Sequence, residues 1–227
     1  GADYFLTYES LKRRLDKKIT LFRQSRDGNA EGTTTQNTIH EARLELKYPL
    51  NQVWSIRGDV FTRLDRDVFK GITPATLSKA SNETFWTGYK TELVFDNTIP
   101  KGLNLLDGTR FKVFYEQYFN VNNDKIRLNA AGFDFRHYEP IHKNIIFCAR
   151  LTANTSWGEQ KVKYVLGGVD NWIFPQYDQS NNPPSQTNYA FQALATNMRG
   201  FKQNIRNGST FTAASVEIRI PIVSYIA

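Results

Sequence analysis

The chain has 227 residues and carries 29 Lys plus Arg against 22 Asp plus Glu, a formal net charge of +7. No stretch approaches 18 consecutive apolar residues, which excludes a transmembrane helix but leaves open a membrane barrel, whose strands alternate apolar and polar residues. The basic residues are scattered among acids rather than clustered, so the positive charge does not indicate a nucleic-acid partner.

Segments with a two-residue hydrophobic period recur along the chain, separated by turn signals, and predict an all-β fold. In chain order, the predicted strands are residues 3–9, 17–25, 38–48, 53–66, 83–96, 108–119, 126–138, 145–157 and 211–222. One segment departs from this pattern. Leu11, Leu15, Ile19 and Phe22 fall at helical spacing, which predicts a short helix over residues 9–18.

The polar face of the predicted strands carries both signs of charge. In residues 53–66, an apolar face opposes a charged one that consists of Arg57, Asp59, Arg63 and Asp65. A soluble sandwich would expose such a face to water, whereas mixed charge is typical of the lining of a polar barrel interior. We therefore predict an antiparallel transmembrane β-barrel, with a soluble β-sandwich or barrel as the alternative.

The connections alternate in length. Short links and long polar loops are expected to alternate along the chain: short at 49–52 and 139–142, long around 26–37, 67–82 and 158–210. Short turns on one side and long loops on the other are typical of outer-membrane barrels. The link over 97–107 is moderately long and falls on the short-turn side. The loop over 158–210 contains apolar segments and is expected to fold rather than act as a linker.

Cys148 is the sole cysteine, which excludes a disulfide framework and a cysteine-rich metal site, and we expect it to fill space on a strand. His40, His137 and His142 lack the spacing of metal ligands, so we expect no cofactor. The chain contains no Gly-x-Ser-x-Gly elbow, no His-Glu-x-x-His motif and no glycine-rich phosphate loop. We therefore expect no catalytic residues and no enzyme activity.

Three motifs follow the predicted strand at 145–157: Tyr164-Val165-Leu166-Gly167-Gly168, then Met198-Arg199-Gly200-Phe201, then Val216-Glu217-Ile218-Arg219-Ile220-Pro221. This order resembles the barrel of the BamA/TamA superfamily of outer-membrane assembly and translocation proteins, also catalogued as bacterial surface antigens. That family shows a strand, a Gly-Gly pair, an arginine-glycine-aromatic loop tip and a strand similar to Glu-Leu-Arg-x-Pro.

Two further stretches carry the resemblance. Phe95-Asp96-Asn97-Thr98, followed by Pro100, Gly102 and Gly108-Thr109-Arg110, looks like the turns of the same barrels. Residues 167–172, Gly-Gly-Val-Asp-Asn-Trp, look closest to the barrels that follow TolB-like propeller domains in some large outer-membrane proteins.

The resemblance implies that residues 1–227 belong to a single outer-membrane barrel and supply about nine of sixteen strands. If the arginine loop is the sixth extracellular loop, residues 145–157 are the eleventh strand, 211–222 the twelfth, and 3–9 lie near the fourth. The sequence departs from the family pattern in several features. The acid that receives the loop arginine lies, in the family, on the strand after residue 222. The family's aromatic C-terminal strand and periplasmic POTRA repeats are likewise not in this sequence.

The resemblance also implies that the loop folds into the barrel and that Arg199 is held there by charge-assisted bonds. An unpaired guanidinium in a partly dewatered lumen is costly, so a carboxylate partner is expected. The candidates within the chain are Glu217, Glu92 and Asp134. The alternative is an ordinary surface arginine on a loop.

The residues around Arg199 have expected roles as well. Gly200 would allow a tight turn and Phe201 would pack against the barrel wall. Gly167 and Gly168 would permit close backbone approach where the loop leaves the barrel, although an ordinary turn explains them too. Glu217 and Arg219 alternate with Val216, Ile218 and Ile220, which places both charges toward the lumen if the apolar face meets lipid.

The function that the resemblance implies is assembly, insertion or translocation of polypeptides at the bacterial outer membrane. The expected partners are outer-membrane lipid and client polypeptides or other envelope proteins, and the expected work is physical rather than catalytic. A passive outer-membrane channel or structural barrel is the first alternative. A soluble β-sandwich that acts as a binding module is the second.

Overall fold

The computed structural model describes residues 3–30, 33–70, 81–102, 104–123, 125–142, 145–169, 173–181 and 191–221. Most of them form one antiparallel sheet with the strand order β1-β2-β3-β4-β5-β7-β8-β9-β13, and β6 pairs with β7 beside this path. The strands of this sheet are β1 (Tyr4–Ser10), β2 (Asp16–Ala30), β3 (Thr33–Pro49), β4 (Trp54–Phe69), β5 (Asn82–Asp96), β6 (Ile99–Gly102), β7 (Leu105–Asn120), β8 (Arg127–His142), β9 (Ile145–Gly158) and β13 (Thr210–Arg219).

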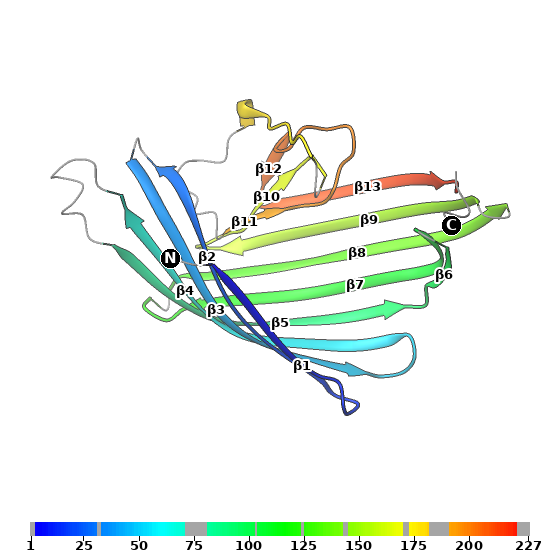
Figure 1. The fold of residues 1–227 in the computed structure, drawn as a ribbon, viewed down its shortest axis with the longest axis horizontal. Coiled ribbons are helices and arrows are strands. Elements are labelled where there is room, and N and C mark those ends of the chain that lie inside the picture. The colour runs from blue at the N-terminus through cyan, green and yellow to red at the C-terminus, as the bar shows by residue number, and fades with distance from the viewer. Residues whose placement is uncertain are drawn as a thin grey trace.

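The nine strands of the main path lie where the two-residue hydrophobic period predicted them, so the all-β, antiparallel prediction is confirmed. From β1 to β5 and from β7 to β9, each strand pairs with the next one along the chain. The sheet curls about the segment between β9 and β13, and β1 and β13 form the two ends of the described strand order (Figure 1). Among the described residues, no helix is long and apolar enough to cross a membrane.

The segment between β9 and β13 is folded, as expected. It contains a three-stranded sheet of β10 (Lys163–Leu166), β11 (Gln192–Leu194) and β12 (Arg206–Gly208), with a short 3-10 helix, η1 (Gln179–Asn181). The end of the predicted strand at residue 222, and residues 71–80, 170–172 and 182–190 of the predicted loops, lie outside the described residues.

The helix predicted over residues 9–18 was wrong. Strand β1 ends at Ser10, residues 12–15 form a bend, and β2 begins at Asp16. The apolar spacing was misleading because these residues do not share a face. Leu11 lies exposed between β1 and the bend, while Ile19 and Phe22 lie on opposite faces of β2. Arg14 donates hydrogen bonds to the carbonyl oxygens of the neighbouring turn after β3, which fixes the bend in place of helical bonds.

Two predicted connections are also mostly strand. The ladder between β2 and β3 continues through polar sequence from Arg26–Asn37 to Ala30–Thr33, so only residues 31 and 32 separate the strands. The predicted short link over 139–142 belongs to β8, with a register shift between Pro140 and His142. Backbone pairing needs no apolar side chains, which is why composition misplaced both boundaries. The 97–107 link folds back through β6 onto the start of β7.

The two faces of the main sheet differ in what they bury and what they expose. The concave face, which the folded segment covers, buries apolar side chains such as Phe61, Trp86, Leu128 and Ile146 together with polar and charged ones, among them Glu41, Arg63, Asp65, Thr152 and Ser156. The convex face exposes large apolar side chains on most of its strands: Ile19, Leu21, Ile56, Val60, Phe85, Leu93, Val113, Phe135, Leu151, Val216 and Ile218. Cys148 is buried on the concave face of β9, as expected.

Candidate functional site

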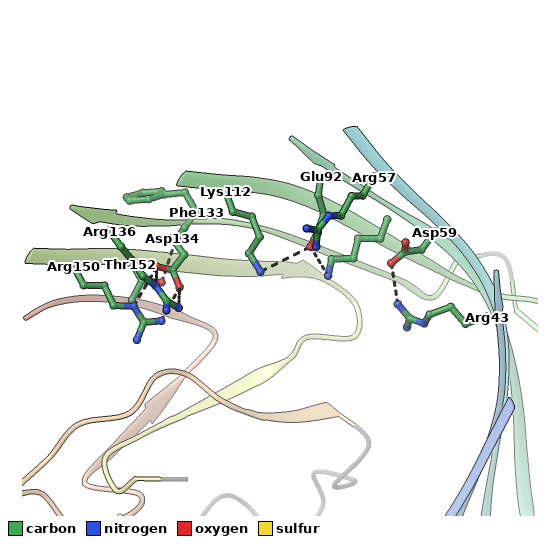
Figure 2. A network of polar contacts seen from close by, with 11 residues as sticks. Arg43, Arg57, Asp59, Glu92, Lys112, Phe133, Asp134, Arg136, Arg150 and Thr152 are labelled. Atoms are coloured by element: carbon green, nitrogen blue, oxygen red, sulfur yellow. Dashed lines mark hydrogen bonds and ion pairs between the residues drawn. The ribbon is translucent and has the colours of Figure 1, made fainter. Parts of the chain in front are cut away.

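The concave face carries a band of ion pairs within and between strands, part of which Figure 2 shows. The carboxylate of Glu92 on β5 lies 2.8 Å from Lys90 Nζ, 3.9 Å from Arg57 Nη1 and 3.9 Å from Lys112 Nζ. These cations come from β4, β5 and β7, so the register of the sheet assembles the cluster. Glu92 is therefore already surrounded by cations of its own strand and of the two neighbouring strands.

Asp134 on β8 is a second centre of this band. Arg136 Nε and Nη2 lie 3.0 and 2.8 Å from its two oxygens, and Arg150 Nε and Nη2 on β9 lie 3.2 and 2.7 Å from the same oxygens. Arg136 and Arg150 are direct cross-strand partners. One carboxylate thus holds two guanidinium groups in a bidentate manner, the strong geometry for such pairs.

The most deeply buried ion pair lies on β4. Arg63 and Asp65 join through Nε–Oδ1 and Nη2–Oδ2 contacts of 2.8 Å each, with side chains only 6% and 5% exposed. Next to them, Arg43 contacts Glu41 at 2.8 Å and Asp59 at 3.3 Å. Charges that are this buried require partners, because an isolated charge out of water is strongly destabilising. Arg63–Asp65 and Arg43–Glu41 are pairs within one strand and Arg43–Asp59 joins β3 to β4, so the concave face is lined with charges that are already paired.

The folded segment between β9 and β13 packs on this face through aromatic contacts. Phe191 is buried and meets Trp86 of β5 edge-on, with ring centroids 5.5 Å apart. The guanidinium of Arg63 lies 4.7 Å from the centroid of the Phe191 ring. Tyr164 packs on Phe211 at 5.1 Å, and burial raises the pKa of Tyr164 to about 12. The segment thus contacts the sheet at two points, Tyr164 and Phe191.

The two loop motifs that the sequence singled out lie side by side in this segment. The Gly168 amide donates to the Phe201 carbonyl at 3.0 Å, and the Met198 amide donates to the Gly168 carbonyl at 2.8 Å. Gly168 and Met198 form an antiparallel bridge. The Gly-Gly pair therefore holds the base of the turn that presents Arg199 and Gly200.

Backbone conformation explains the glycines at this point. Gly167 and Gly168 have φ values of 102° and 77°, in the left-handed region that other residues seldom adopt. A Cβ on Gly167 would overlap the carbonyl oxygen of Lys202. Gly200 also has a positive φ, 82°, but the space around it is open. Close approach therefore explains Gly167, whereas the turn alone explains Gly200.

Of the three candidate partners of Arg199, the structure brings only Glu217 close. Arg199 Nη1 lies 3.9 Å from Glu217 Oε1, and the Arg199 side chain is 79% exposed. Glu217 also accepts from Arg219 Nε and Nη2 at 3.2 and 3.1 Å, and Arg219 Nη1 donates to the Asn104 carbonyl. Glu92 and Asp134 are engaged by the cations described above. The exposed tip thus makes a long ion pair with the last strand of the sheet.

Asn204 was not identified from the sequence, although it organises the folded segment. It is fully buried with a φ of 62°, and its amide group donates to the carbonyl oxygens of Asp178 and Asn181. Asn207 donates to Asn204 Oδ1 at 2.9 Å and to the Asn181 carbonyl at 2.6 Å. Asparagine is enriched at left-handed positions, but that signal does not distinguish this residue from the others in the loop. Phe191 was missed for a similar reason, because no periodic strand surrounds it.

The described residues contain no group of three or more His, Cys, Asp or Glu side chains that could hold a metal ion. No protein-family model and no curated protein gives a significant match to the sequence.

Proposed function

We propose that this chain is part of an outer-membrane β-barrel in which the convex face meets lipid and the concave face lines a lumen that holds the arginine loop. The observation that carries the proposal is the row of large apolar side chains exposed on the convex face of the sheet. A soluble sheet buries its apolar face, and a large exposed apolar surface marks contact with lipid or a partner. On the opposite, concave face, ion pairs such as Arg63–Asp65 are covered together with apolar side chains such as Trp86.

The length of the strands supports the same proposal. Strands β2 to β5 and β7 to β9 have 14 to 17 residues each. A tilted membrane-spanning strand needs about 9–11 residues, so these strands are long enough to cross a bilayer and to extend beyond it. Each of them pairs with a strand on both sides, and a bilayer requires such pairing of backbone groups.

An aromatic cluster on the convex face fits a membrane interface. Tyr89 lies 6.2 Å from Tyr115 and 6.3 Å from Phe119, and Tyr115 lies 6.2 Å from Trp157. The hydroxyl groups of Tyr89 and Tyr115 donate to the side chains of Gln117 and Asn129 at 3.0 and 2.9 Å. Rings with a satisfied polar end are enriched where hydrocarbon gives way to headgroups.

Resemblance to the BamA/TamA superfamily extends the proposal to function. The protein would assist the assembly, insertion or translocation of polypeptides at the bacterial outer membrane, without catalytic residues. Its partners would be outer-membrane lipid and client polypeptides or other envelope proteins. In this view residues 1–227 supply about nine strands of a sixteen-stranded barrel. The long Arg199–Glu217 pair would hold the loop tip loosely enough to be released.

A passive outer-membrane channel or structural barrel is the second candidate, because the ion-pair band and the folded segment would also suit a lumen that clients never enter. The soluble β-sandwich is less well supported. The outer faces of a soluble sandwich would carry polar side chains, whereas the convex face here exposes large apolar ones such as Ile56 and Val60.

The two membrane candidates are separated by changing the loop tip in cells that depend on the protein. Arg199→Gln should reduce the amount of client protein assembled in the outer membrane or secreted, with the barrel itself still present. Arg206→Gln is the matched control, because Arg206 is a cation of the same segment outside the motif and contacts only the Ile205 carbonyl among the bonds described. Equal client levels in the two variants would support the passive barrel. A protein that stays monodisperse without detergent would contradict both membrane candidates.

A further inference from the structure

A cavity of about 460 Å³ lies between the arginine loop and the concave face of β8, β9 and β13. Four arginines line it: Arg136 from β8, Arg150 from β9, Arg219 from β13 and Arg199 from the loop tip. The side chains of the three strand arginines are 36%, 25% and 29% exposed, so solvent only partly screens them. The cavity is therefore a place where positive charge converges from four different segments.

The carboxylates nearby do not balance this charge. Asp134 forms ion pairs with both Arg136 and Arg150, and Glu217 forms ion pairs with both Arg219 and Arg199. Four guanidinium groups thus share two carboxylates, which leaves an excess of two positive charges around the cavity. Asp134 uses Nε and Nη2 of both its partners, so their Nη1 groups make no bond to it.

We propose that this cavity binds a phosphate group, either free or as a phosphate monoester. A phosphate carries about −1.5 to −2 charges at neutral pH, which complements the excess, and guanidinium groups bind its oxygens through charge-assisted, often bidentate bonds. Ser215 contributes a hydroxyl group opposite Arg150, its cross-strand partner. Met198, Phe201 and Tyr138 supply apolar and aromatic surface for the organic part of an ester. The proposal holds whether or not the convex face meets lipid.

Calorimetric titration of the purified protein with inorganic phosphate tests this inference, with chloride at equal ionic strength as the reference. Binding in the millimolar range or tighter is expected. A parallel titration with glycerol 1-phosphate distinguishes the source of the group. Tighter binding of the ester identifies an esterified phosphate, and tighter binding of the inorganic ion identifies free phosphate. Heat no different from that of chloride in both titrations would overturn the proposal.

Two variants test the location of the site. Arg150→Gln should weaken phosphate binding by about tenfold or more, because a charge-assisted bond is lost. Ser215→Asp leaves every arginine in place and adds a competing carboxylate to the cavity, so it should abolish phosphate binding. This second variant keeps the test valid if Arg150→Gln fails to fold. The control is Arg66→Gln, which removes the same charge from an exposed pair with Glu83 outside the cavity. Unchanged binding in Ser215→Asp, or an equal loss in Arg66→Gln, would show that phosphate binds elsewhere.

Discussion

The amide nitrogen of Gly168 donates a hydrogen bond to the carbonyl oxygen of Phe201 across 3.0 Å, although a long stretch of loop separates the two residues. This bond joins the glycine pair that follows β10 to the arginine turn that precedes β12. The turn is therefore held from its base, while Arg199 at its tip remains exposed. Stability of the base and freedom of the tip are separate properties, which different substitutions should affect.

Substitution of Gly167 should loosen the base of the loop. Gly167→Ala places a Cβ against the Lys202 carbonyl at a positive φ, and we expect a cost of about 1–3 kcal/mol. Hydrogen exchange of the Ala195 and Ile205 amides, which bond to Val165 and Leu166, should accelerate accordingly. Gly58→Ala is the control, because nothing lies within 4 Å of a Cβ there. Unchanged exchange in Gly167→Ala would show that the close approach does not constrain the loop.

Substitution of Asp134 should destabilise the sheet itself. Asp134→Asn removes the only carboxylate bonded to both Arg136 and Arg150 among the described contacts, at an expected cost of about 1.5–3 kcal/mol. The measurement is the urea midpoint of unfolding in detergent. Asp107→Asn breaks a more exposed pair with Lys101 and should cost less than about 1 kcal/mol. Similar midpoints for both variants would mean that water screens the concave face.

Substitution of Asn204 should unfold the covering segment without melting the sheet. Asn204→Asp keeps the shape but turns a donor into an acceptor facing the Asp178 and Asn181 carbonyls, with an expected cost of about 1–3 kcal/mol. Limited proteolysis should then cut within residues 191–208 before the strands are attacked. Asn122→Asp, in the exposed turn after β7, serves as control. Equal protease resistance in both variants would show that Asn204 does not stabilise the folded segment.

The strands were predictable from the sequence because the two-residue period persists along each of them, as in β4, where Ile56 and Val60 alternate with Arg57 and Asp59. The boundaries were not, because polar residues such as those of the β2–β3 hairpin pair as well as apolar ones. The ion-pair partner of Arg199 could also not be identified from the sequence. Choosing among Glu217, Glu92 and Asp134 requires the register, which brings Lys112 to Glu92 and Arg150 to Asp134.

The exposed apolar face of the sheet is the basis of the proposed function, and cysteine scanning along β4 tests its contact with lipid most directly. Single cysteines replace Ile56, Arg57, Asp59 and Val60 in turn on a Cys148→Ala background, and each carries a fluorophore in vesicles that contain brominated lipid. We expect strong quenching at positions 56 and 60, on the convex face, and little at positions 57 and 59. Weak quenching at all four positions would contradict the account, because it would place the apolar face of the sheet outside the hydrocarbon.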